Sequence, residues 1–228
     1  ASTVFETLLG VTMYSIKEAF YSLQGEGAQA GRPSIFCRFS GCNLWNGKES
    51  GREAAICQFC DTDITGTDGE NGGSYAQQAL LDLAIALWPD LSKGKPYVVF
   101  TGGEPALQLT ESLISDFKKA GFECAVESNG TLPLPTNLDW VCISPKGRSK
   151  VIATQCNELK MVFPQADITP QQVEHITADY YFLSPMAEYG VDNSGMIIRE
   201  NMQSATQYCL DNPRWRMSLQ THKLLGIA

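Results

Sequence analysis

Residues 34–63 read SIFCRFSGCNLWNGKESGREAAICQFCDTD, and this stretch decides the fold because it joins a short apolar run to a loop that carries three cysteines. Cys42 and Cys57 enclose fourteen residues, whereas Cys57 and Cys60 enclose two. Three thiolates without a fourth ligand nearby in the sequence favour an iron–sulfur cluster with one open iron position, since a cluster that only transfers electrons normally has four cysteines. The open position predicts a bound substrate or cofactor. A zinc clip completed by a distant cysteine or histidine is the alternative.

The other cysteines occur singly and do not resemble a disulfide framework, which is typical of small secreted domains. Three of them, Cys37, Cys124 and Cys142, lie in apolar runs that predict buried strands. Cysteine packs there as a small hydrophobic side chain. We therefore expect only the three cysteines of the loop to bind iron.

The composition predicts one globular domain over residues 13–228. The chain has 228 residues, of which 43% are hydrophobic and 18% charged, and its net charge is −8. This charge and the lack of a Lys/Arg cluster argue against a nucleic-acid or anionic-membrane partner, and no transmembrane helix is expected. Residues 1–12 lack the features of a secretory signal. We expect them to be an N-terminal extension or expression remnant before Met13, and we expect a cytoplasmic protein.

Apolar β-branched runs alternate with helix-period stretches along the chain, which is the pattern of a parallel sheet with crossover helices. Strands are predicted at 35–39, 96–101, 122–127, 140–144, 158–163, 179–184 and 214–220. Helices are predicted at 75–88, 107–120, 170–177 and 199–211. About six β/α units are too few for a closed eight-stranded barrel, which needs about 250 residues. The predicted fold class is therefore α/β, as a partial, open β/α barrel or an open α/β sheet.

Polar residues follow three of these predicted strands at their carboxyl ends. The strands and the residues after them read VVFTGGEP (98–105), FECAVESNG (122–130) and WVCISPK (140–146). Glycines at a strand end let a ligand approach the backbone, and an adjacent carboxylate can pair with an ammonium group. Taken alone, Gly-Gly-Glu is more often a turn, but its place after the cysteine loop favours a binding site. Arg38 has a planar fork that suits a substrate carboxylate, although an ion pair with a nearby Asp or Glu explains it equally well.

The cysteine loop followed by Gly-Gly-Glu resembles the radical S-adenosylmethionine family. Further motifs, in the order FYSLQGEGAQAGRPSIFCRFSGCNLW, FCDTD, TGGEP, ESNGT, SPK and WRMSLQTHK, resemble one branch of that family over nearly all of residues 14–228. The resemblance implies a [4Fe–4S] cluster, S-adenosylmethionine and Mg²⁺ as cofactors in a partial barrel. It implies a radical that removes a hydrogen from 6-carboxy-5,6,7,8-tetrahydropterin, whose ring contracts with loss of ammonia on the way to queuosine. The fourteen-residue insert between the first two cysteines departs from the shorter spacing that is commonest in the family.

The resemblance assigns roles to residues by their place in these motifs. Cluster ligands would be Cys42, Cys57 and Cys60, and Thr62 would bind Mg²⁺, which takes few protein ligands; capping of a turn by Thr62 is the alternative. The residues expected to bind S-adenosylmethionine are Phe59, Cys60, Asp61, Gly103, Glu104, Glu127, Ser144, Pro145, Lys146, Ser184, Pro185, Met186 and Ala187. The residues expected to bind the substrate are Leu23, Gln24, Gly25, Glu26, Arg38, Thr101, His222 and Ala228. Residues 184–187 read SPMA, where glutamine is expected first.

The C-terminal segment SLQTHKLLGIA is apolar, and we expect Leu224, Leu225 and Ile227 to pack against the body of the protein. This packing would bring His222 and the carboxylate of Ala228 to the catalytic face. A tail that only covers the open side of the barrel is the alternative.

The resemblance also implies an external one-electron reductant such as flavodoxin, and a homodimer. Two other functions stay open. One is an activating enzyme that makes a glycyl radical on a protein partner; it shares the cysteine loop and Gly-Gly-Glu but needs neither LQGEG nor QTHK. The other is a non-catalytic iron–sulfur protein that transfers electrons or acts as a sensor.

Overall fold

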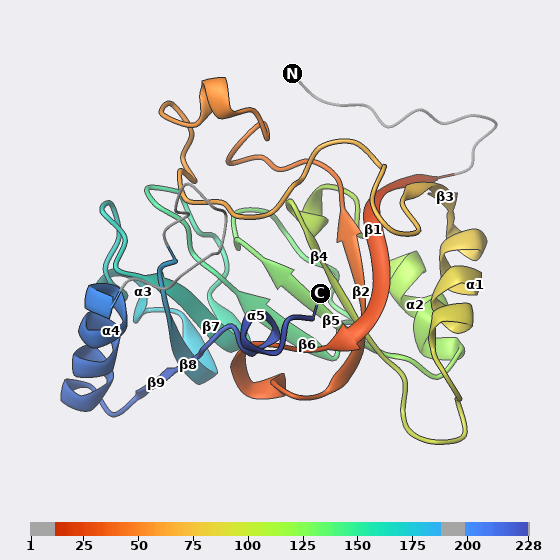
Figure 1. Ribbon diagram of the computed structural model, residues 1–228. Helices are drawn as coiled ribbons and strands as arrows, with labels where there is room; N and C mark the ends of the chain where they lie inside the picture. Colours follow the sequence, from red (N-terminus) through yellow and green to blue (C-terminus); the bar gives the residue numbers. More distant parts are fainter. Residues whose placement is uncertain (1–11, 188–198, 228) are drawn as a thin grey trace.

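The computed structural model describes residues 12–187 and 199–227, and within them nine strands form one open sheet (Figure 1). The sheet order is β3-β1-β2-β4-β5-β6-β7-β8-β9. The strands are β1 Met13–Leu23, β2 Pro33–Phe39, β3 Gly73–Ala76, β4 Tyr97–Gly102, β5 Glu123–Ser128, β6 Trp140–Ile143, β7 Gln155–Phe163, β8 Thr177–Pro185 and β9 Trp215–Met217. The α-helices are α1 Gln77–Leu87, α2 Glu111–Lys119, α3 Pro170–Val173, α4 Arg199–Asp211 and α5 Thr221–Leu225. The 3-10 helices are η1 Gly27–Gln29, η2 Glu49–Gly51 and η3 Pro105–Leu107.

The sheet is parallel from β2 onward, and β1 pairs antiparallel with both β2 and β3. Its two edges, β3 and β9, do not pair with each other, so the predicted open barrel is confirmed. Six connections join the successive parallel strands in the described part of the chain, but only four of them contain an α-helix. Pro133 and Pro135 lie in the helix-free connection between β5 and β6, where proline disfavours a helix because it lacks a backbone N–H.

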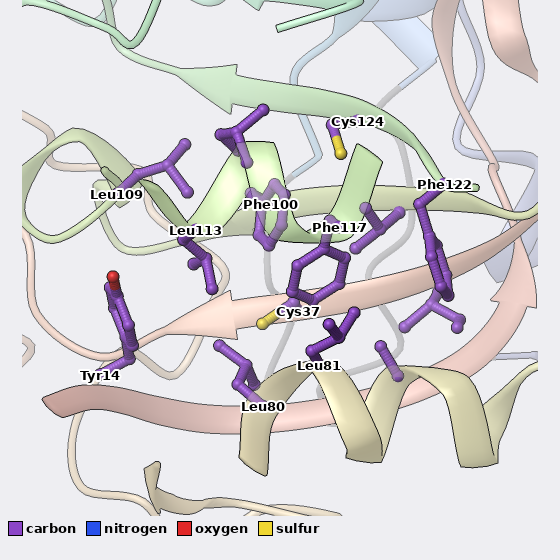
Figure 2. Close-up of a cluster of buried hydrophobic side chains, with 14 of the residues drawn as sticks. Tyr14, Cys37, Leu80, Leu81, Phe100, Leu109, Leu113, Phe117, Phe122 and Cys124 are labelled. Atoms are coloured by element: carbon purple, nitrogen blue, oxygen red, sulfur yellow. The ribbon is translucent and has the colours of Figure 1, made fainter. Parts of the chain in front are cut away.

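An apolar core joins α1 and α2 to one side of β1, β2, β4 and β5 (Figure 2). Cys37 and Cys124 lie inside this core, and burial raises the pKa of each thiol to about 12. Cys142 is likewise buried. The prediction that these three cysteines are core residues is confirmed. A second core, which includes Leu159 and Trp215, lies among β6 to β9, α3 and α4.

Two strands were not predicted, because neither has a regular apolar pattern. In β1 the pairing register with β2 shifts between Ile16 and Glu18, and such an irregularity interrupts the alternation of inward and outward side chains. β3 has only four residues, and none of them is fully buried. β1 matters for the site, because it leads directly into the LQGEG motif.

Several predicted boundaries are wrong. β7 begins at Gln155 rather than at 158, and the first two residues of the helix predicted at 75–88 belong to β3. The helix predicted at 107–120 is divided, because α2 begins only after Thr110, whose side chain accepts a hydrogen bond from Leu113 N as a helix cap. The helix predicted at 170–177 ends at Val173, and β8 already begins at Thr177. The strand predicted at 214–220 is limited to β9, and α5 follows it.

The C-terminal segment does not pack as predicted. Leu224, Leu225 and Ile227 are 73%, 63% and 38% exposed. The segment is instead held through polar contacts, since the backbone N–H and the hydroxyl of Thr221 both donate to the carbonyl of Gly25, at 3.0 and 2.8 Å. Ala228 lies outside the described residues. So do residues 1–11 of the extension predicted at 1–12. Among the described residues, no helix is long and apolar enough to cross a membrane.

Candidate active site

A cavity of about 420 Å³ opens at the carboxyl ends of the parallel strands. In Figure 1 the loop after β2, drawn in orange, extends beyond these strand ends. Most residues predicted to bind cofactors or substrate line this cavity. They are Glu26, Arg38, Cys42, Cys57, Phe59, Cys60, Asp61, Thr62, Thr101, Gly103, Glu127, Ser144, Lys146, Ser184, Pro185, Met186, Ala187 and His222. Leu23, Gln24, Gly25, Glu104 and Pro145 do not line it.

The three loop cysteines reach one side of the cavity from a single segment of chain. Cys42 and Cys60 pack beside the same small apolar cluster. Cys57 and Cys60 share a hydrogen bond, which raises the pKa of Cys57 and lowers that of Cys60 to about 7. No three His, Cys, Asp or Glu side chains in residues 12–187 and 199–227 converge as a single metal ion requires. A [4Fe–4S] cluster takes its cysteine thiolates on different iron atoms, so three cysteines that line one side of the cavity fit it by number and chemistry.

The Gly-Gly-Glu turn packs directly on the start of the cysteine loop. Gly103 N donates to Phe39 O at 3.0 Å, and Glu104 N donates to Gly41 O at 2.9 Å. A Cβ atom on Gly103 would lie 1.8 Å from Gly41 O, a backbone atom that cannot move aside cheaply. Glycine is therefore required at 103 for the two loops to approach each other.

Glu104 is buried, and its carboxylate forms hydrogen bonds inside the protein. Its carboxylate accepts hydrogen bonds from Ser128 Oγ, Asn129 N and Ala106 N, at 2.8, 2.8 and 3.0 Å, and the residue is completely buried. Burial raises its pKa, although these hydrogen bonds oppose the shift. The structure thus places Glu104 where it ties β5 to the turn, and away from the cavity where an ammonium group could meet it.

Two of the loops predicted to hold S-adenosylmethionine present polar groups to the cavity. Lys146 Nζ donates to Ser144 Oγ after β6. Ser184 Oγ, at the end of β8, is buried and has no hydrogen-bond partner among the described residues. A buried hydroxyl without a partner is costly unless a ligand or water satisfies it, which favours a ligand at this position. Pro145 instead lies behind the loop, where its carbonyl accepts from Gln165 Nε2 at 3.3 Å.

The opposite side of the cavity contains a charged cluster around Lys160 of β7. Lys160 Nζ lies 2.8 Å from Glu26 Oε2 and 3.2 Å from Glu127 Oε2. Gln24 Nε2 donates to the other oxygen of Glu127 at 3.0 Å. The two carboxylates outweigh the cost of burial and hold the pKa of Lys160 well above its ordinary value. Sequence reasoning missed Lys160; a lysine inside the apolar run of β7 was the available signal.

His222 and Arg38 face the same space. Gly25 allows His222 to approach, since a Cβ at position 25 would lie 2.0 Å from His222 Nδ1, and burial lowers the pKa of His222. Arg38 Nε lies 2.9 Å from Glu18 Oε1, but their angles do not make a hydrogen bond. Arg38 thus forms the ion pair that was the alternative explanation for it. Its side chain also lines the cavity.

Thr62 lies at the rim of the cavity, next to the last cysteine. Its hydroxyl is 3.4 Å from Asp61 Oδ1, and Asp61 Oδ2 accepts from Lys223 Nζ at 3.1 Å. Lys223 connects α5 to the cysteine loop. The C-terminal helix and the cysteine loop therefore line the same edge of the cavity.

Comparisons with known proteins agree with this geometry. No protein-family model matches the chain. A 7-carboxy-7-deazaguanine synthase of Bordetella pertussis is 53% identical over 94% of this chain and 99% of the relative. The chain belongs to the 7-carboxy-7-deazaguanine synthase family. The relative from Bradyrhizobium diazoefficiens is 49% identical, with the same coverage of both chains.

Similarity to a solved structure supports the fold. The crystal structure of QueE from Escherichia coli matches 91% of this chain and 93% of that chain with a TM-score of 0.63, at 23% identity. The resemblance to radical S-adenosylmethionine enzymes is confirmed at the level of the family. An activating enzyme and a non-catalytic electron carrier are not favoured.

Proposed function

We propose that the protein converts 6-carboxy-5,6,7,8-tetrahydropterin to 7-carboxy-7-deazaguanine with release of ammonia, using a [4Fe–4S] cluster, S-adenosylmethionine and Mg²⁺. One observation carries the proposal: a single cavity joins the three loop cysteines on one side to the charged cluster of Lys160, Glu26 and Glu127 on the other. A [4Fe–4S] cluster and a polar heterocycle can therefore occupy the same cavity.

The loop side of the cavity suits the cofactors. Cys42, Cys57 and Cys60 would hold the cluster, which together with S-adenosylmethionine supplies the hydrogen-abstracting radical when bound. Lys146 and Ser184 would meet the polar groups of S-adenosylmethionine, since Ser184 Oγ is buried without a partner in the described residues.

The charged side of the cavity suits the substrate. Carboxylates accept hydrogen bonds from the amino and ring N–H groups of a pterin, so Glu26 would orient its ring. Glu127, which contacts Lys160 beside Glu26, would keep its predicted role toward S-adenosylmethionine. Arg38 would bind the substrate carboxylate, because a guanidinium offers parallel N–H donors. Gln24 and Gly25 would act indirectly. Gln24 donates a hydrogen bond to Glu127, and Gly25 leaves room for His222.

The remaining assignments follow from the family resemblance. Thr62 would contribute its hydroxyl to Mg²⁺, with substrate and water as the other ligands. The resemblance also supports an external one-electron reductant such as flavodoxin, a homodimer and a cytoplasmic location.

Anaerobic reconstitution with iron and sulfide, followed by incubation with reductant and S-adenosylmethionine, tests the proposal. We expect the deazapurine product and ammonia only when the carboxylated tetrahydropterin is present. Efficient cleavage of S-adenosylmethionine without formation of that product would indicate an activating enzyme. A reducible cluster that cleaves no S-adenosylmethionine under either condition would indicate an electron carrier.

A further inference from the structure

The fourteen-residue insert, residues 43–56, folds into a small unit against the cysteine loop. Trp45 and Ala55 form an apolar cluster with Ile64. The chain then returns beside its own start, since Ile56 N and Cys57 N both approach Leu44 O, at 3.1 and 3.4 Å. The insert therefore packs as a defined unit next to Cys57 and Cys60. The number of cysteine ligands does not explain why the insert is there.

Arg52 joins this unit to the segment between Cys57 and Cys60. Its Nη1 donates to the carbonyls of Gln58 and Cys60, at 3.0 and 3.1 Å. Its Nε and Nη2 donate to the two carboxylate oxygens of Glu49, at 2.7 and 2.5 Å. The guanidinium carbon lies 4.1 Å from the centre of the Trp45 ring. One side chain thus binds two carbonyl groups in the turn that carries two cysteines.

The carbonyl contacts matter because residues 57–60 belong to no helix or strand. Their peptide groups have no backbone ladder to fix their direction, so a donor from elsewhere must do so. A planar guanidinium can hold two carbonyls and a carboxylate at once, whereas the ammonium of lysine is a flexible point charge. The ion pair with Glu49 contributes little by itself, because the Glu49 side chain is 76% exposed.

We propose that Arg52 is a positioning residue for the iron–sulfur cluster. It orients the turn from Cys57 to Cys60 by binding the carbonyls of Gln58 and Cys60, and the ring of Trp45 packs beside its guanidinium. The inference rests on the proposed [4Fe–4S] site. It gives the insert a function: to carry the side chain that shapes the turn.

The test compares the wild-type protein with Arg52→Lys, Arg52→Met and, as the matched control, Glu49→Gln. Each protein is reconstituted anaerobically, and the rate of iron release to a chelator is measured beside the melting temperature of the apoprotein. We expect both Arg52 variants to release iron about 10-fold faster or more, the usual scale for removing a residue that orients metal ligands. Glu49→Gln should stay within about twofold of the wild type, because its partner contact is exposed.

Iron release from Arg52→Lys at the wild-type rate would overturn the inference. That variant keeps the positive charge and loses only the planar guanidinium with its several N–H donors. If Arg52→Met lowers the melting temperature of the apoprotein severely, Arg52→Lys alone decides. A wild-type protein that binds no cluster would refute the proposed function instead, so the two failures are distinguishable.

Discussion

Replacing Lys160 by methionine should expose how the substrate side of the cavity is stabilised. Lys160 is 5% exposed, and its ammonium lies 2.8 Å from Glu26 and 3.2 Å from Glu127. Methionine has an unbranched apolar side chain that can occupy the space of the lysine stem, so the substitution mainly removes charge. The two carboxylates then stay in a partly buried site without this cation.

The expected cost follows from the exposure of the partners. Removing one member of a buried ion pair destabilises a protein by about 3–5 kcal/mol. The Glu26 and Glu127 side chains are 17% and 26% exposed, so solvent reduces that cost and we expect about 2–4 kcal/mol. For a domain of this size the loss corresponds to a fall in melting temperature of roughly 4–16 °C.

The effect should depend on pH with a definite sign. Burial alone would raise the pKa of Glu26, but Lys160 and a hydrogen bond from Gln220 outweigh it and hold that pKa below its ordinary value of 4.5. A lowered carboxyl pKa stabilises the folded state above the ordinary pKa, and this stabilisation is lost as the pH falls through the folded-state pKa. In Lys160→Met the pKa of Glu26 should rise. The difference in stability from the wild type is therefore largest at neutral pH and shrinks as the pH falls through the raised pKa.

Thermal unfolding of the apoprotein between pH 4 and 8 measures this difference. Lys17→Met is the matched control, because Lys17 also contacts two carboxylates, at 2.6 Å each, but those side chains are 62% and 83% exposed. The control should lose much less stability. An equal loss in both variants, or a loss in Lys160→Met that grows as the pH falls, would refute the reasoning.

Three further predictions concern the loop side of the site. Alanine at any of the three loop cysteines should abolish iron and sulfide binding, whereas Cys124→Ala, a core substitution, should lower stability and keep the cluster; iron analysis decides. Thr62→Ala should weaken the response of turnover to Mg²⁺, and identical Mg²⁺ titrations for variant and wild type would remove Thr62 from the site. Gly103→Ala should separate the two loops, because its Cβ would lie 1.8 Å from Gly41 O; a cluster that releases iron to a chelator at the wild-type rate would contradict this.

Much of the architecture could be predicted from local patterns. The apolar runs that became β2, β4, β5 and β8 have a clear length and composition, and parallel strands necessarily place the polar residues after them at one edge of the sheet. The order of the motifs from LQGEG to QTHK was sufficient to indicate the family. These features are carried by short stretches of chain, so they do not depend on long-range contacts.

Other features arise only when distant segments meet. Glu104 reads as a ligand in TGGEP, yet its carboxylate binds Ser128 at the end of β5 and Asn129 directly after it. Leu224 and Leu225 read as core residues, yet they are exposed because Thr221 and Lys223 hold the segment through polar contacts. No sequence period marks either arrangement.

Motif order by itself indicated the family, and the alternation of apolar runs with helix-period stretches predicted the parallel sheet. Cysteine spacing predicted three cluster ligands. Each of these signals is carried by short stretches of the chain. The tertiary structure decided which polar groups share the cavity. Lys160 becomes part of the site only because β7 lies opposite the loop after β1, where Glu26 meets its ammonium. Arg52 acquires a role only because the insert folds back on the cysteine turn. Ion pairs and hydrogen bonds to carbonyl groups depend on distances of a few ångströms between segments. The separation of two residues in the sequence does not specify those distances.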